Sequence, residues 1–304
     1  MRFDCRDVRF LQFPVPVPVP PPPVVITRFL YVSNFLDDTV EIYDITNPTV
    51  PVRVGEFNTG NLNTPIGLAI TGTTLYVANQ GDNTVEIYDI STPASPVRVG
   101  EFNAGNLDLP RGLAITGTIL YVTNANNSTV EIYDISTPAS PVRVGEFNAG
   151  NLSVPSGLAI TGTTLYVSNF AFDDSVEIYN ITNPIVPVRV GEFNAGNLDN
   201  PSGLAIIGTT LYVANTGSPA TSAVEIYNIT NPTVPVRVGE FNAGNLNQPF
   251  GLAITGTTLY VANQNNNNVQ IYDITNPAAP VRITEFGVGD LNQPIGLAIF
   301  TLVG

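Results

Sequence analysis

The chain has 304 residues, of which 43% are hydrophobic and 12% charged, with a formal net charge of −14 and a pI near 4.1. This composition indicates a folded, globular protein. The acidic charge argues against nucleic acid as a partner, because no basic stripe is present to displace counterions from phosphates. The lack of a long apolar run argues against membrane insertion, and the charges near the N-terminus argue against a Sec signal peptide.

Residues 1–23 are interpreted as an extended arm. Prolines alternate with valines from Pro14 to Pro20 and continue to Pro23, which predicts polyproline II and a stiff spacer. The preceding residues 8–13 can add a strand to the sheet edge of another protein subunit or fibre. A disordered tail with an incidental thiol is the alternative. If the arm is an anchor, a disulfide between Cys5 and the partner secures the attachment. The anchoring residues are then Cys5, Val8, Phe10 and Phe13.

Two short motifs repeat along the rest of the chain. Leu-Tyr-Val begins at Leu30, Leu75, Leu120, Leu165, Leu211 and Leu259. Gly-Leu-Ala-Ile begins at Gly67, Gly112, Gly157, Gly203, Gly251 and Gly296. In the unit 67–102, turn-forming residues separate four short segments rich in Val, Ile, Tyr and Phe, which predict strands over residues 67–70, 75–78, 84–90 and 96–102. We name these strand positions a, b, c and d.

Four short strands in every unit of 45 to 48 residues, with no helical spacing between them, are typical of β-propeller blades. We therefore predict an all-β fold over residues 24–304, a six-bladed β-propeller of four-stranded antiparallel blades. The first unit begins at position b, so the last position-a strand, residues 296–299, should pair beside residues 30–33 and close the first blade. Residues 24–27 are the competing occupant of that place.

The segment LYVANQGDNTVEIYDISTPASPVRVGEF, residues 75–102, resembles the LVIVD-type and YVTN-type β-propeller repeats of bacterial surface and secreted proteins. The resemblance extends over about residues 24–304. Members of these families are mostly binding or surface-display modules, so the resemblance implies a propeller fold and a binding role. The order of arm, spacer and propeller also resembles leader-bearing proteins of bacterial spore surfaces and appendages.

Variation collects on one face of the expected disc. Strand direction alternates within a blade, so the b–c and d–a loops emerge on one face and the a–b and c–d turns on the other. The turns barely differ between units, whereas the b–c loops and the last residues of the d–a loops vary. Recognition often resides in loops held by a rigid scaffold, although unconstrained loops also drift. We assign to a ligand-binding face Phe35, Asp37, Asp38, Phe170, Phe172, Asp173, Asp174 and Phe250.

The chemistry of this face favours a carbohydrate or protein ligand, because rings stack while carboxylates accept hydrogen bonds. We predict no cofactor and no metal, with a Ca²⁺ ion held by paired aspartates as the alternative. Three other patterns are expected to be structural. Asn79 and its counterparts should cap loops, Tyr76 and its counterparts should pack between blades, and Glu86 should form an exposed ion pair with Arg98.

Catalysis is not predicted. The chain contains no His and no Lys, which removes the commonest general base, every Ser-His arrangement and Schiff-base chemistry. We therefore predict a non-enzymatic surface-display or adhesion module, tethered through its arm to a bacterial cell or spore surface or to a fibre. Two alternatives stay open: an intracellular, cytoplasmic protein-interaction scaffold, and a carboxylate-dependent hydrolase that uses Asp37, Asp38, Asp173 and Asp174.

Overall fold

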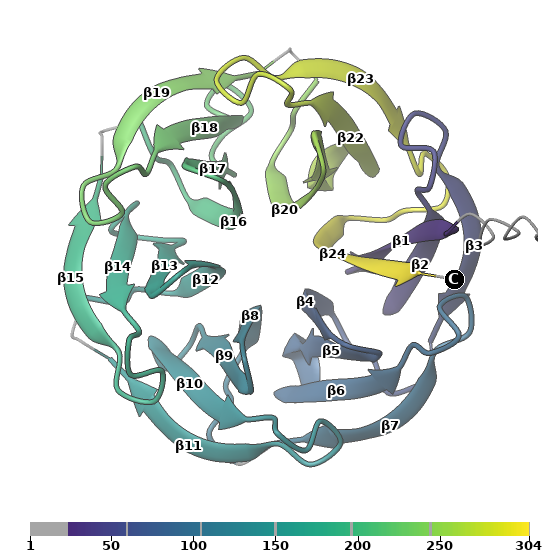
Figure 1. Ribbon diagram of the computed structural model, residues 1–304, viewed down its shortest axis with the longest axis horizontal. Helices are drawn as coiled ribbons and strands as arrows, with labels where there is room; N and C mark the ends of the chain where they lie inside the picture. The colour runs from purple at the N-terminus through teal and green to yellow at the C-terminus, as the bar shows by residue number, and fades with distance from the viewer. Residues whose placement is uncertain are drawn as a thin grey trace, which may run out of the picture.

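A computed structural model describes residues 24–58, 60–103, 105–148, 151–194, 197–242 and 245–303. These residues form six four-stranded antiparallel sheets arranged as the blades of a ring (Figure 1). Blade 1 has the strand order β24-β1-β2-β3, and blades 2 to 6 follow the chain from β4 to β23. The predicted six-bladed all-β propeller is confirmed. None of the described segments is a helix long and apolar enough to cross a membrane.

The two inner strand positions of each blade carry the most apolar sequence. Position a surrounds the centre of the ring (Figure 1) and consists of β24 (Pro294–Val303), β4 (Pro65–Thr71), β8 (Pro110–Thr116), β12 (Pro155–Thr161), β16 (Pro201–Ile207) and β20 (Pro249–Thr255). Position b consists of β1 (Ile26–Asn34), β5 (Thr74–Asn79), β9 (Ile119–Asn124), β13 (Thr164–Asn169), β17 (Thr210–Asn215) and β21 (Thr258–Asn263).

The two outer positions alternate apolar with charged residues. Position c consists of β2 (Thr39–Asp44), β6 (Thr84–Asp89), β10 (Thr129–Asp134), β14 (Val176–Asn180), β18 (Ala223–Asn228) and β22 (Asn268–Asp273). Position d forms the rim and consists of β3 (Val52–Phe57), β7 (Val97–Phe102), β11 (Val142–Phe147), β15 (Val188–Phe193), β19 (Val236–Phe241) and β23 (Val281–Phe286). Short 3₁₀ turns, η1 (Gln80–Asp82) and η2 (Gln264–Asn266), occupy two b–c loops.

The ring closes within blade 1. Strand β24 pairs antiparallel with β1, from Val303 opposite Ile26 to Pro294 opposite Asn34. This pairing confirms the predicted closure by the last strand. The competing placement of residues 24–27 is wrong, because Ile26 and Thr27 extend β1 itself and pair with the end of β24.

Neighbouring blades are joined by buried apolar contacts and by tyrosines. Six apolar clusters each combine residues from two adjacent blades. Tyr76 is fully buried, as predicted, and its hydroxyl donates to the carbonyl of Pro138 in the next blade at 3.0 Å. The counterparts of Tyr76 in blades 1, 3, 4 and 5 make the same bond. Among the described residues, the buried hydroxyl of Tyr260 in blade 6 has no such partner.

The inner strands approach one another most closely at the glycine of each Gly-Leu-Ala-Ile motif. A β-bulge lies here, because the register between β12 and β13 shifts between Pro155 and Leu158. A Cβ added to Gly157 would lie 2.1 Å from the carbonyl oxygen of Ser202 in the next blade. The other five glycines meet the same clash at 1.9 to 2.1 Å. Only glycine therefore fits at this level of the ring.

Blades 1 to 5 each bury a glutamate beside an arginine. Arg98 Nε donates to Glu86 Oε2 at 2.7 Å, and Arg98 Nη2 donates to Glu101 Oε2 at 2.5 Å. The Glu86 side chain is only 1% exposed, so the prediction of an exposed pair is wrong for the glutamate. Burial raises the pKa of Glu86, and one arginine shared by two carboxylates offsets this only in part. Its counterparts with raised pKa are Glu41, Glu131, Glu177 and Glu225.

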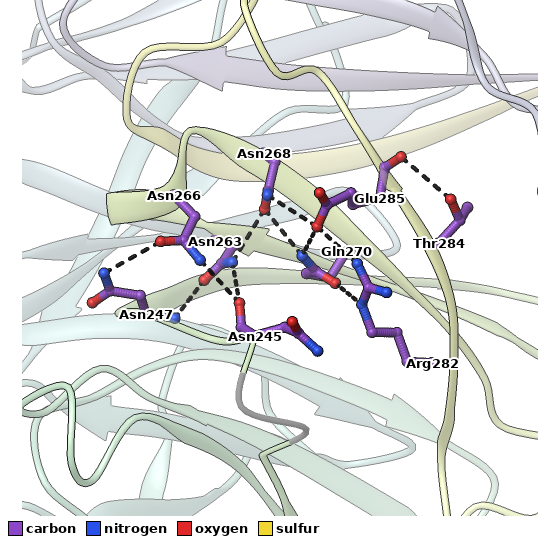
Figure 2. Close-up of polar contacts among 9 residues, drawn as sticks. All are labelled: Asn245, Asn247, Asn263, Asn266, Asn268, Gln270, Arg282, Thr284 and Glu285. Atoms are coloured by element: carbon purple, nitrogen blue, oxygen red, sulfur yellow. Dashed lines mark hydrogen bonds and ion pairs between the residues drawn. The ribbon is translucent and has the colours of Figure 1, made fainter.

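Blade 6 carries a neutral residue at the same place (Figure 2). Gln270 Oε1 accepts from Arg282 Nε at 2.5 Å, and Gln270 Nε2 donates to Glu285 Oε2 at 2.5 Å. The amide thus makes the two bonds that a protonated glutamate would make there. Blade 6 shows that the network accommodates a neutral central side chain.

Replacing Gly157 by Ala should destabilise the ring by about 3 kcal/mol or more, because the added methyl group must displace a backbone carbonyl of the next blade. Urea denaturation followed by circular dichroism measures this change. The matched control is Gly239→Ala on the rim, where an added Cβ meets no atom within 4 Å. The control should stay within about 0.5 kcal/mol of the parent. Equal losses in the two variants would contradict the glycine constraint.

The buried glutamates should make the protein less stable as pH rises. The pKa of Glu177 is raised from 4.5 to about 7, so the folded state binds this proton more tightly than the unfolded state. The resulting stabilisation is fully present below pH 4.5 and is lost as pH rises through about 7. Glu177→Gln should therefore raise the melting temperature at about pH 8 and change it little at about pH 4.5. Gln270→Glu should have the reverse effect. A melting temperature that rises with pH over this range would refute the assignment.

Candidate functional site at the ring axis

The residue before each of the six glycines is not constant, because it is Ile in two blades, Ser in two, Arg in one and Phe in one. We call these six residues the axial ring: Ile295, Ile66, Arg111, Ser156, Ser202 and Phe250, in the order of blades 1 to 6. A β-bulge at the start of each position-a strand shifts the register, so these residues do not follow the regular alternation of side chains between the two faces of the sheet. All of them except Ser202 line a cavity on the axis of the ring.

The axial cavity is small and mostly apolar. It has a volume of about 80 Å³ and lies among the axial ring, the six glycines and the six leucines that follow them. Each of these leucines is only 7% or 8% exposed. The cavity is smaller than the roughly 300 Å³ of a pocket that encloses a drug-sized ligand. It is therefore suited to one functional group or to a short molecule.

Arg111 is the one cation in this lining. Its Nε and Nη1 atoms are buried and have no hydrogen-bond partner. The ion pairs found among the described residues involve six other arginines, all at position d. Burial lowers the pKa of the Arg111 guanidinium, and arginine side chains keep their positive charge in proteins. Arg111 as a whole is partly buried, and an anion or a polarised carbonyl oxygen would stabilise a partly buried cation that has no counter-charge.

Aromatic side chains cover the cavity near Arg111. The Phe170 ring lies 5.0 Å from the Arg111 Cζ atom, close enough for a cation–π contact, and its centroid lies 5.8 Å from that of Phe250. Phe35 and Phe170 both pack against the buried cluster of Ile66, Phe250 and Ile295. The structure thus brings together Phe35, Phe170 and Phe250 of the predicted face. Phe172 is 90% exposed and does not belong to this cluster.

Hydroxyl groups from position b fix the polar side of the ring. Thr123 Oγ1 accepts from Gly112 N at 2.6 Å and donates to Ser156 O at 2.8 Å. Ser168 makes the same pair of contacts between blades 4 and 5, and Ser33 makes it between blades 1 and 2. The backbone that directly follows Arg111, and the backbone at Ser156 and Gly157, are therefore held in place by these hydroxyl groups.

The predicted aspartates do not converge on the axial cavity. Asp38 Oδ1 accepts from Thr64 N at 2.7 Å, and Asp174 Oδ1 accepts from Asn200 N at 2.8 Å, so each joins its loop to the next blade. In blades 2 and 6 the amides of Asn83 and Asn267 fill the same role, which therefore needs no charge. Asp37 accepts from two asparagine side chains. Asp173 lines a separate polar cleft with Glu177 and Glu192.

The asparagine that ends each position-b strand holds a more distant loop than expected. Asn79 Oδ1 accepts from Asn63 N at 2.6 Å, and Asn79 Nδ2 donates to Asn61 O at 2.8 Å. Both partners lie in the preceding d–a loop and not in the b–c loop that follows Asn79. The Asn79 amide also donates to Asp82 Oδ2 in the b–c loop at 3.3 Å, so it ties the two variable loops together.

Several predicted features remain outside the described residues or without a structural counterpart. The anchoring residues Cys5, Val8, Phe10 and Phe13 lie in the part of the chain that is not described. In the described ranges, no group of three or more acidic, His or Cys side chains is arranged to hold a metal ion.

Sequence inspection missed Arg111, Ser156 and Ser202. The signal was present, because the d–a loops end in different residues directly before the constant Gly-Leu-Ala-Ile motif. Phe250 was selected from this position as an exposed aromatic, whereas Arg111 was not selected. The bulge that turns this position to the axis is not visible in the strand pattern.

Two family models match parts of the chain. A model described as Lactonase, 7-bladed beta-propeller matches residues 27–143, which include Arg111. A model of the LVIVD repeat matches residues 251–286. Each covers less than half of the chain. Comparison with curated proteins finds no match.

Solved structures share the fold at low sequence identity. A chain from the crystal structure of a nidogen/laminin complex has a TM-score of 0.67 and 17% identity, and the match covers 90% of this chain and 98% of that one. A candidate 6-phosphogluconolactonase from Bacteroides fragilis has a TM-score of 0.64 and 13% identity, with the same coverage. The periplasmic gluconolactonase PpgL of Pseudomonas aeruginosa has a TM-score of 0.63 and 14% identity, and the match covers 86% and 80%. At these identities the likeness shows the fold alone.

The predictions of a non-enzymatic surface-display or adhesion module, and of no enzymatic activity, are contradicted by the Lactonase match and the gluconolactonases among the similar structures. The hydrolase alternative agrees better with these findings. The prediction relied on the lack of His and Lys. That reasoning did not weigh a buried arginine, which can stabilise developing negative charge without changing its protonation state.

The LVIVD match confirms the resemblance inferred from the repeated segments. Residues 251–286 span the four strands of blade 6, from β20 to β23. The match thus coincides with one structural blade. The chain is a repeat-type β-propeller, and one of its six blades matches the LVIVD repeat model.

Proposed function

We propose that the axial cavity binds a small lactone and hydrolyses it to the hydroxy acid, with Arg111 as the group that holds the carbonyl oxygen. One observation carries this proposal: Arg111 lines a cavity on the axis, and its buried Nε and Nη1 atoms have no hydrogen-bond partner among the described residues. Such a donor set is complementary to a carboxylate or to the oxyanion of acyl transfer.

In the proposed reaction, solvent supplies the attacking oxygen and the proton, and the cavity supplies Arg111. A hydroxide ion from solvent attacks the lactone carbonyl carbon, and the carbonyl oxygen takes up negative charge beside Arg111. The bond from that carbon to the ring oxygen then breaks and leaves a carboxylic acid and an alkoxide. The alkoxide takes up a proton from solvent and the acid releases one to solvent, so the product leaves as a hydroxy acid carboxylate. Removing one oxyanion donor typically costs about 10² to 10³ in rate. This is the contribution that we assign to Arg111.

The comparisons support this choice of substrate class. The Lactonase model matches the segment that carries Arg111, and two structural neighbours bear gluconolactonase names. Among the described residues that line the cavity, none is a carboxylate. The hydrolase proposed here therefore differs from the carboxylate-dependent version and is centred on Arg111.

Arg111→Ser should raise the melting temperature in buffer without carboxylates, because it removes a partly buried cation whose Nε and Nη1 atoms have no hydrogen-bond partner among the described residues. Serine is also the residue at this place in blades 4 and 5. Sodium acetate should raise the melting temperature of the parent and not that of the variant. Differential scanning fluorimetry with sodium chloride at equal ionic strength measures both effects.

The control for this experiment is Arg28→Ser, which removes the same charge from β1 beside a separate small pocket. It should keep the response to acetate. A parent protein that does not respond to acetate, or an Arg111→Ser protein that responds equally, would contradict anion binding at the axis.

Lactone hydrolysis should depend on Arg111 and rise with pH. We expect turnover of γ-butyrolactone above the spontaneous rate in a pH-stat, and a loss in kcat/KM of about 10² to 10³ in Arg111→Ser. The rate should rise about tenfold per pH unit through neutrality, because hydroxide is the attacking species and Arg111 does not titrate there. Arg28→Ser should match the parent. Equal turnover by the Arg111→Ser protein would place the activity elsewhere.

A further inference from the structure

The axial ring is divided into two contiguous halves. Blades 3, 4 and 5 contribute the polar residues Arg111, Ser156 and Ser202. Blades 6, 1 and 2 contribute the apolar residues Phe250, Ile295 and Ile66, which form one buried cluster. The cavity therefore has a polar side and an apolar side that face each other across the axis.

The polar side offers few free hydrogen-bonding groups besides Arg111. The Ser202 hydroxyl lies 2.5 Å from Thr216 Oγ1. Thr216 Oγ1 in turn donates to Pro249 O at 2.7 Å. The amides of Gly112 and Gly157 donate to the hydroxyls of Thr123 and Ser168. Among the side chains that line the cavity, only those of Arg111 and Ser156 are polar.

The apolar side is extended beyond the ring by neighbouring residues. Phe35 packs against the Ile66 and Ile295 cluster from the loop of blade 1. Phe170 reaches from blade 4 and contacts both Phe250 and Arg111. The leucines that follow the six glycines continue the apolar lining along the axis. A molecule held by Arg111 at one end therefore meets hydrocarbon on its other side.

We infer that the axial site selects amphipathic ligands, namely short alkyl or aryl carboxylates and their lactones, over polyhydroxylated sugar acids. This inference rests on the proposed function and names its substrate class. The carboxylate or carbonyl group lies at Arg111 and Ser156, and the hydrocarbon part lies against Phe250, Ile295 and Ile66. A hydroxyl group on that part would lose its hydration without gaining a partner, which makes sugar acids poor ligands.

The test compares carboxylates that differ only in the hydrocarbon part. Acetate, propanoate and butanoate form a series, and 2,3,4-trihydroxybutanoate has the carbon skeleton of butanoate with three hydroxyl groups. Isothermal titration calorimetry with the full chain gives the dissociation constants. We expect affinity to rise about fourfold per added CH₂, the equivalent of about 0.8 kcal/mol, until the cavity is full. The trihydroxy acid should bind at least about tenfold more weakly than butanoate.

A variant that replaces one apolar residue of the axial ring by a polar one sharpens the test. Phe250→Ser places at blade 6 the residue of blades 4 and 5, and should weaken butanoate binding about tenfold while acetate changes less than about twofold. Phe250→Leu keeps an apolar side chain and should retain most of the preference for butanoate. The series with the parent protein remains decisive if Phe250→Ser does not fold.

The outcomes separate this inference from the proposed function. Binding that depends on Arg111 but not on chain length, or tighter binding of the trihydroxy acid, overturns the amphipathic selection and leaves the proposed function standing. Absence of any Arg111-dependent carboxylate binding, together with absence of lactone turnover, overturns both. The same order of preference in turnover, with γ-butyrolactone above its hydroxylated counterpart erythronolactone, would extend the result from binding to hydrolysis.

Discussion

The contact between each inner glycine and a backbone carbonyl of the next blade fixes the geometry of this protein. No side chain fits between Gly67 and the carbonyl of Arg111, or at the five equivalent places around the axis. The six inner strands can therefore approach until backbone meets backbone, and the channel narrows to a small cavity. The residue before each glycine lies in the β-bulge, which turns its side chain toward the axis. The close approach of the glycines and this bulge occur at the same level, so each blade contributes one variable side chain to the axis.

This arrangement separates stability from function within each repeat. Buried tyrosines, leucines and the Glu–Arg–Glu groups recur from blade to blade and hold the ring together. The axial ring has no such uniformity, and it contains Arg111, whose buried Nε and Nη1 atoms have no hydrogen-bond partner among the described residues. An arginine kept without an ion pair beside a cavity is more readily explained by a ligand than by packing. The six residues of the axial ring thus make one side of the cavity polar and the other apolar, although the blades around it are nearly identical.

The sequence predicts the fold of this chain far better than its site. Tyr76 and Leu75 recur at regular spacing, so the number of blades, the strand order and the closure by residues 296–299 follow from the repeats. The burial of Glu86 does not follow, because a charged residue in an alternating strand is normally assigned to solvent. Arg111 was overlooked for a related reason. Its position directly before a constant motif reads as the end of a loop, and only the bulge and the close approach of the glycines turn it inward.

The lengths of β1 and β24 have a consequence for how a chain of near-identical units finds its correct partners. The inner strands resemble one another in sequence, so during folding β24 meets several strands with which it could pair. Strand β24 has ten residues and β1 has nine, whereas β4 and β5 have seven and six. The additional pairs, from Ile26 with Val303 to Arg28 with Thr301, are available only when these two strands meet. The additional residue pairs between β1 and β24 thus favour this pairing over the pairing of β24 with another inner strand. They form only once β24, which follows all other strands in the chain, is present.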